Sequence, residues 1–236
     1  MRQNEHGQLG SDARIELQFL GGAALHRDGH PLSGTATRRH PLAWLAMLRT
    51  APRHATSRPK ASALLWPDAD ETTGRNRLSS TVYPLRKLLG PDALTASGDT
   101  LRLDPGRVRC DVWAFREALE STDPETAVRI YGGPFLDGFY IEDSALFDEK
   151  VESVRLELHR AWARAVRVLA EGAEQAKRYG EAVHRWQTLS AGDPLDSAVA
   201  GRLYAAEDGG PRLSIVDLES EAVVGTVPLP ATPSGL

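Results

Sequence analysis

The order of two hydrophobic periodicities in the first 111 residues most constrains what this chain can fold into. Residues 14–22 (RIELQFLGG) alternate apolar and polar side chains, which predicts a strand buried on one face. Asp28-Gly29 then predicts a hairpin turn with a short strand on each side. Three segments of helical periodicity follow, and the turn signals Gly98-Asp99 and Pro105-Gly106 predict a hairpin with room for a third short strand.

Strands, three helices and a hairpin is the element order of a winged helix, whereas the pattern after residue 111 is helical. A long amphipathic helix is predicted over 144–180, and shorter helices are predicted over 181–192 and 196–206. Paired helices of this kind are typical of a tetratricopeptide-like stack. The predicted fold class is therefore mainly α with small β-sheets. Four segments are expected: a disordered N-terminus, a winged helix, a helical domain and a β-prone tail, over 1–13, 14–111, 112–206 and 207–236.

The charge of the chain divides at the same place. Residues 1–111 hold 16 Lys and Arg against 11 Asp and Glu, a net charge of +5, whereas residues 112–236 hold 12 against 21, a net charge of −9. A basic half joined to an acidic half indicates one module for a polyanion and another for a different partner. Two ordinary domains of different isoelectric point would give the same sums.

The third predicted helix has two unlike faces. With Leu78 at 0° and 100° per residue, Val82, Leu85 and Leu89 fall within 40° of it and form a buried stripe. The opposite face bears amide, hydroxyl and ammonium groups and no carboxylate, which suits approach to phosphate and to base edges: Asn76, Ser80, Tyr83 and Lys87. An ordinary solvated helix is the alternative. Pro84 falls at 240°, outside the stripe, and predicts a bend in the helix rather than a break.

The segments LLWPDADETTGRNRLSSTVYPLRKLLGPDAL and LRLDPGRVRCDVWAFREAL resemble the antibiotic regulatory protein (SARP) type of transcriptional regulators. YGGPFLDGFYIEDSALFDEKVESVRLEL and AGDPLDS resemble the bacterial transcriptional activator domain of that family, so the resemblance covers about residues 14–206. It implies a winged helix of the response-regulator effector type followed by a tetratricopeptide-like domain. Pro84 and His40-Pro41 depart from the family pattern.

The resemblance also implies which residues meet DNA. Residues 72–89 become the recognition helix, so the outward face becomes the DNA face, and the hairpin becomes a wing that contacts phosphate or the minor groove. The implied DNA-binding residues are Asn76, Arg77, Ser80, Tyr83, Lys87, Arg102, Arg107 and Arg109. Arg86 lies at the edge of the buried stripe, and we expect it to pair with an acid inside the domain, with phosphate contact as the alternative.

Other chemistry finds little support in the sequence. His26 and His30 lie on either side of a turn and do not form a metal-ligand set, and no phosphate-cradling GxxxxGK[ST] motif occurs. The lone Cys110 is expected in the core, and Trp113, Phe115, Trp162 and Trp186 are expected in the core or in a partner groove. Loop 132–138 (GGPFLDG) is expected to dock Phe135 and Phe139 into the helical stack. We expect no metal or cofactor and no enzymatic activity.

The expected function is sequence-specific binding of double-stranded DNA by a transcriptional regulator, an activator. The helical domain is expected to self-associate or to contact other proteins such as RNA polymerase. The alternative is a protein-interaction scaffold whose winged helix no longer binds DNA. With one cysteine, no signal-peptide pattern and no apolar run of 18 residues, a cytoplasmic location without membrane insertion is expected.

Overall fold

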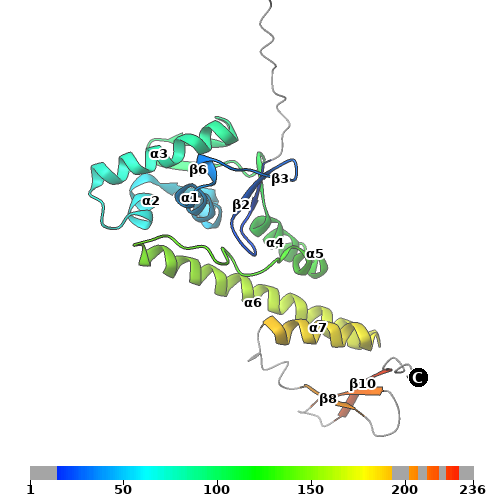
Figure 1. Ribbon diagram of the computed structural model, residues 1–236. Coiled ribbons are helices and arrows are strands. Elements are labelled where there is room, and N and C mark those ends of the chain that lie inside the picture. The colour runs from blue at the N-terminus through cyan, green and yellow to red at the C-terminus, as the bar shows by residue number, and fades with distance from the viewer. Residues whose placement is uncertain (1–14, 193–201, 207–211, 218–221, 229–236) are drawn as a thin grey trace, which may run out of the picture. The chain divides into compact units, whose positions relative to one another are not determined.

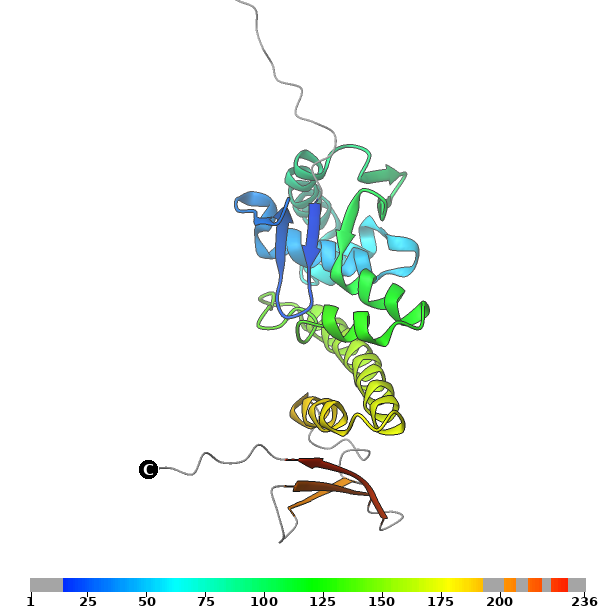
Figure 2. The same cartoon turned by 90° about the vertical axis from the view of Figure 1, so that its right-hand side faces the viewer.

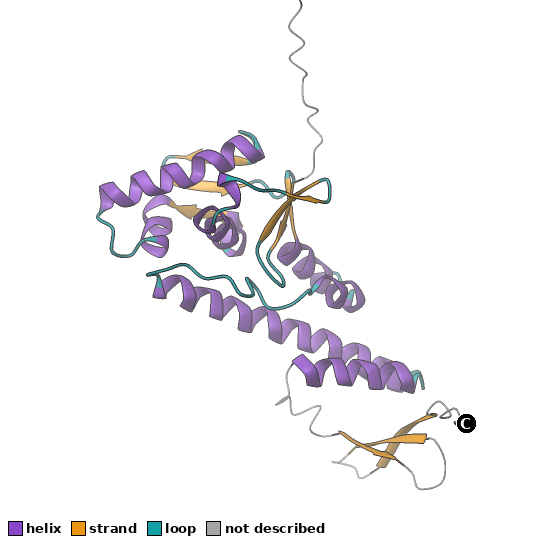
Figure 3. Ribbon diagram, viewed as in Figure 1, coloured by secondary structure: helices purple, strands orange, loops and turns teal. Residues whose placement is uncertain are grey.

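The computed structural model describes residues 15–192, 202–206, 212–217 and 222–228. The expected disordered N-terminus, residues 1–13, therefore lies outside the described residues. The chain divides into two compact units, of which the first comprises 1–117 with 130–158, and the second 118–129 with 159–236. Both units are built from helices and small sheets (Figures 1 and 3). The fold class is thus mainly α with small β-sheets, as predicted.

Two small sheets frame the first unit. The four-stranded sheet has the order β3-β2-β1-β7 and contains β1 (Ile15–Gln18), β2 (Ala24–Arg27), β3 (His30–Pro31) and β7 (Val108–Cys110). The three-stranded sheet has the order β4-β6-β5 and contains β4 (Ala55–Ser57), β5 (Leu94–Ser97) and β6 (Thr100–Leu103). The predicted turn between β2 and β3 is confirmed, because Asp28 and Gly29 both have positive φ, of 51° and 79°. The chain order of strands, three helices and a hairpin is that of a winged helix.

Three helices fill the space between these sheets: α1 (Arg39–Thr50), α2 (Arg58–Leu65) and α3 (Glu71–Leu89). In Figure 2, α1 passes behind β1 and β2. Every residue of α1 from Pro41 to Arg49 is buried, so this helix is the centre of the winged-helix core. Two short 3-10 turns flank it, η1 (Thr35–Thr37) and η2 (Pro52–His54).

The remaining helices are α4 (Asp111–Glu120), α5 (Pro124–Ile130), α6 (Ala145–Gln175) and α7 (Tyr179–Gly192). In the second unit, α7 packs antiparallel on the later part of α6. The Trp186 indole N–H donates to Glu174 at 2.7 Å, and a Cβ on Gly192 would meet the Trp162 ring. The buried Trp162 and Trp186 are therefore core residues, as expected.

The loop 132–138 does not join the helical stack, contrary to expectation. Gly21 N–H donates to the Pro134 carbonyl at 3.0 Å and Leu136 N–H donates to the Phe19 carbonyl at 2.8 Å, so the loop extends the end of β1. Phe135 is fully buried edge-on against Phe19, 6.3 Å between ring centres. The aromatic residue of this loop therefore completes the core beneath the four-stranded sheet, which no local pattern predicts.

The C-terminal segment forms a three-stranded sheet with the order β10-β9-β8: β8 (Arg202–Ala206), β9 (Arg212–Asp217) and β10 (Ala222–Pro228). The β-prone character of 212–228 is confirmed. The helix predicted over 196–206 is wrong for residues 202–206, which pair with β9 as a strand, and its earlier part lies outside the described residues. The strand pairing of 202–206 is a long-range choice that helical periodicity alone does not reveal.

Candidate nucleic-acid interface

Helix α3 begins and ends at defined capping groups. The Asp70 carboxylate accepts from Thr73 N–H at 3.0 Å, and this hydrogen bond lowers the pKa of Asp70. At the other end the chain leaves the helix at Gly90, with φ of 91°. Arg27 of β2 donates to the Leu88 carbonyl at 3.2 Å, so a cation from the sheet satisfies one of the last carbonyls of the helix.

The predicted buried and outward faces of α3 are both present. Leu78, Val82 and Leu85 are buried, whereas the side chains expected to face DNA are all exposed: Asn76, Arg77, Ser80, Tyr83 and Lys87. The Tyr83 side chain is 71% exposed, which is unusual for an aromatic residue and leaves its ring and hydroxyl free to meet a partner surface. No acidic side chain lies on α3 after Glu71 in its first turn.

Arg77 stands apart from the other four outward residues. Burial, and then the charge of Arg77, lower the pKa of His40, so the guanidinium lies near the imidazole of His40 on α1. The His40 ring stacks on Trp66 with ring centres 5.1 Å apart. Arg77 therefore occupies the flank of α3 that faces α1, at one border of the outward face rather than in its middle.

Several basic groups along α3 have no acidic partner. Arg75 pairs with Glu71 at 3.1 Å, but within the described residues neither Arg77 nor Lys87 forms an ion pair. The expected pairing of Arg86 with an acid does not occur among these residues, and its Nε is buried without a hydrogen-bond partner. The outward face thus presents uncompensated positive charge.

Pro84 lies inside α3, which continues through it from Glu71 to Leu89 without interruption. Its ring is half-buried, next to the buried stripe. The proline lacks an N–H for the Ser80 carbonyl, so one rung of the helix is missing between Ser80 and the last turn.

The residues expected on the wing are divided between two sheets. Arg102 is exposed on β6 of the β5–β6 hairpin, and Arg107 is exposed in the turn after β6, where its guanidinium lies 3.9 Å from the Asp92 carboxylate. Arg109 instead lies on β7, opposite Glu16 of β1 in the other sheet. The expectation that Arg109 belongs to the wing hairpin is therefore wrong, because β7 leaves the hairpin to pair in parallel with β1.

Sequence reasoning missed Arg58, which the fold brings to the tip of the wing. Its N–H donates to the Asp99 carbonyl in the β5–β6 turn at 2.7 Å. Arg58 and Arg75 line a small groove of about 170 Å³ between α2, the start of α3 and this turn. The signal was the sequence SRPK: Ser57 caps α2 and Pro59 occupies its first turn, which places basic residues at a helix N-terminus.

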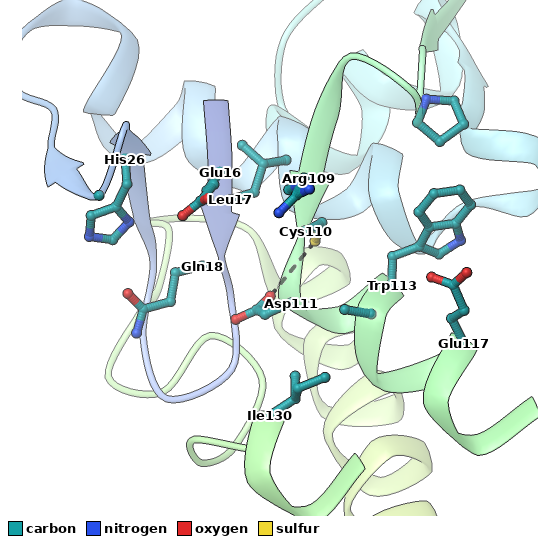
Figure 4. Close-up of a pocket in the computed structure, with 13 residues that line it drawn as sticks. Glu16, Leu17, Gln18, His26, Arg109, Cys110, Asp111, Trp113, Glu117 and Ile130 are labelled. Carbon is teal, nitrogen blue, oxygen red and sulfur yellow. Dashed lines mark hydrogen bonds between the residues drawn. The ribbon is translucent and has the colours of Figure 1, made fainter. Parts of the chain in front are cut away.

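A larger groove of about 720 Å³ lies away from α3, against the outer face of the four-stranded sheet (Figure 4). Its lining mixes charges of both signs, from Glu16, His26, Arg109 and Glu117. Asp111 at its floor accepts from the N–H groups of Phe19 and Leu20, each at 2.8 Å, and so ties the start of α4 to the end of β1.

Cys110 is buried in the wall of this groove, as expected for a core residue. Burial, together with the Asp111 carboxylate, raises the pKa of the Cys110 thiol to about 11. A thiol with so high a pKa carries almost no thiolate at neutral pH. Trp113 also lines the groove and is 36% exposed, unlike the fully buried Phe115.

A solved structure can be compared with this chain. A scan against protein-family models and a search of curated proteins give no match. The chain is similar to the structure of Mycobacterium tuberculosis EmbR in complex with a low-affinity phosphopeptide, with a TM-score of 0.50 and 21% sequence identity. The likeness concerns the fold. It covers 80% of this chain and 58% of the EmbR chain, and it agrees with a winged helix followed by helices. No helix among the described residues is both long and apolar enough to cross a bilayer.

Proposed function

We propose that this protein is a sequence-specific DNA-binding transcriptional regulator, and an activator. The observation that carries the proposal is the outward face of α3, where amide, hydroxyl, aromatic and cationic side chains are exposed without a carboxylate among them. Such a face suits a major groove, since amides and guanidinium groups read base edges there and cations meet phosphate. The sequence resemblance to SARP-type regulators supports the same function.

In this proposal α3 enters the major groove and the wing holds the backbone. Asn76, Ser80 and Tyr83 read the bases, Arg77 and Lys87 border them, and Arg102 and Arg107 contact phosphate. Arg109 lies on the other sheet and is kept only as a comparison. Residues 14–111 form the DNA-binding region, and residues 112–206 form an activator domain, tetratricopeptide-like, that contacts RNA polymerase or a second copy. The expected location is the cytoplasm, and the role of the 207–236 tail is left open.

The first test is binding by the full chain to duplexes selected from a random pool. With about five phosphate contacts, the logarithm of the affinity should fall with the logarithm of the salt concentration with a slope of roughly −4 to −5 per monomer. Gel retardation at several salt concentrations measures this slope. No retardation, or a slope near zero, would favour the scaffold alternative.

The second test separates base reading from backbone holding. Asn76→Ala is expected to cost about 1–3 kcal/mol of binding and to relax the preference at one base position, whereas Arg107→Ala weakens all sequences alike and reduces the salt slope by about one. Arg109→Ala removes the same charge from the other sheet and is the control. If Asn76→Ala weakens every duplex equally, Asn76 has no reading role.

A further inference from the structure

The hydroxyl of Ser144 joins the ends of two helices. Its Oγ donates to the carbonyl of Leu64 in the last turn of α2 at 2.6 Å. The same oxygen accepts from the N–H of Phe147 at 3.3 Å, in the first turn of α6. The Ser144 side chain is 2% exposed, so neither hydrogen bond competes with water.

Both partners of Ser144 are groups that a helix cannot satisfy by itself. The last four carbonyls of an α-helix and its first four N–H groups have no intrahelical partner. Because α2 ends at Leu65, the Leu64 carbonyl is one of these groups. A hydroxyl can donate once and accept twice, so one serine can serve both helix ends together.

The segment before Ser144 makes a second attachment to the same helices. Arg39 of α1 donates to the Tyr140 carbonyl at 3.0 Å, and its guanidinium lies 3.9 Å from the centre of the Tyr140 ring. Ile141 between them is buried. Residues 140–144 therefore lie against the start of α1 and the end of α2, and Figure 1 shows the start of α6 near α2.

Helix α2 in turn supports α3 directly. Gly74 of α3 has no room for a Cβ, because that atom would overlap the side chain of Ser62 on α2. The Trp66 residue that ends α2 carries the stack with His40, beside which Arg77 of α3 lies. A displacement of the end of α2 therefore reaches the first half of α3, where Asn76 and Arg77 lie.

We infer that Ser144 is a positioning residue that ties the first turn of α6 to α2 and, through α2, sets the placement of α3. The division between the two compact units falls inside α6, after Leu158. A partner that shifts α6 thus has a hydrogen-bonded route to the DNA-facing helix. The consequence for DNA affinity rests on the proposed function, whereas the coupling between helices does not.

The test measures amide hydrogen exchange in the full chain without DNA. For Ser144→Ala we expect exchange about three- to tenfold faster in residues 58–66 and 71–89, while β1 and β7 keep their protection. Ser144→Thr keeps the hydroxyl and should restore the protection. Asp123→Ala, which removes an exposed N-cap from α5, is the control for cap loss alone and should leave both segments unchanged.

Three outcomes would overturn the inference: faster exchange confined to the first turn of α6, a uniform increase over the whole chain, or unchanged exchange in both helices. If Ser144→Ala does not fold, Ser144→Gly replaces it, because glycine is a tolerated N-cap that still lacks the hydroxyl. In a DNA arm, the ratio of affinities for selected and random duplexes should fall about three- to tenfold in Ser144→Ala. Wild-type protein that binds no DNA but shows the exchange pattern refutes the proposed function and keeps the coupling.

Discussion

At the scale of single residues, two buried groups show how this core tolerates polarity. The Arg49 side chain is 2% exposed, and its Nε, Nη1 and Nη2 atoms have no hydrogen-bond partner among the described residues. Its guanidinium lies 4.9 Å from the centre of the Trp113 ring, which provides a cation–π contact in place of hydrogen bonds. Asp111 is satisfied instead, because backbone N–H groups surround its carboxylate.

A close backbone approach at Gly21 leads to the first prediction. Gly21 has φ of 83°, and a Cβ there would lie 2.8 Å from the Gly132 carbonyl oxygen. Gly21→Ala should therefore lower the free energy of unfolding by more than about 2 kcal/mol, through backbone strain and steric overlap. Gly29→Ala is the matched control, since its φ is 79° with nothing within 4 Å, and it should cost only about 1–2 kcal/mol. Urea unfolding measures both, and equal losses would contradict the overlap.

The second prediction concerns pH. Burial, followed by the charge of Arg49, lowers the pKa of His54 below its ordinary 6.5. The unfolded chain therefore binds a proton at this residue more readily than the folded chain, so stability falls as the pH drops through 6.5 toward the folded pKa. His54→Asn, which suits the φ of 53° at this position, should flatten the dependence of stability on pH between 7 and 5. His30→Asn on the exposed β3 is the control, and identical pH profiles for wild type and His54→Asn would contradict the prediction.

At the scale of elements, α3 combines strong caps with a missing rung. Asp70 and Gly90 define its ends, and Arg27 satisfies a carbonyl in its last turn. Pro84 removes one hydrogen bond in its interior, so the helix is held by its packing and its caps rather than by an unbroken ladder.

Pro84→Ala should raise the free energy of unfolding by an amount up to ~3 kcal/mol, because alanine restores the N–H and is the best helix former. Pro59→Ala in the first turn of α2 is the control and should give no such gain, since its N–H has no intrahelical acceptor. Thermal unfolding measures both variants. If the bend at Pro84 fits the operator, affinity for a selected duplex falls in Pro84→Ala, and if it is a blemish the affinity rises. A loss of stability would contradict the strain assigned to Pro84.

At the scale of the whole molecule, compactness does not follow chain order. The first unit includes residues 130–158, which come after the predicted boundary at 111. The reason lies in three contacts: Phe135 packs on Phe19, Arg155 donates to the carbonyls of Phe135 and Leu136 at 2.7 and 2.6 Å, and Ser144 binds the end of α2.

A fragment of residues 1–111 should therefore be less stable than a fragment of residues 1–158. Removing the loop exposes the Phe19 surface and discards two fully buried side chains, Phe135 and Leu136, so the free energy of unfolding should fall by about 3–5 kcal/mol. Circular dichroism during thermal unfolding gives the comparison. Equal stability of the two fragments would mean that residues 1–111 form an independent folding unit.

The sequence by itself determined the elements of the winged helix and the two faces of α3. Hydrophobic period, turn residues and caps are local signals, so the strands, the three helices and the exposure of Asn76, Ser80, Tyr83 and Lys87 followed from spacing alone. Only the tertiary structure decided which strand Arg109 joins, that residues 202–206 pair as a strand, and that Phe135 fills the core beneath β1. These outcomes depend on pairings between residues far apart in the chain, whose free energy no local pattern contains.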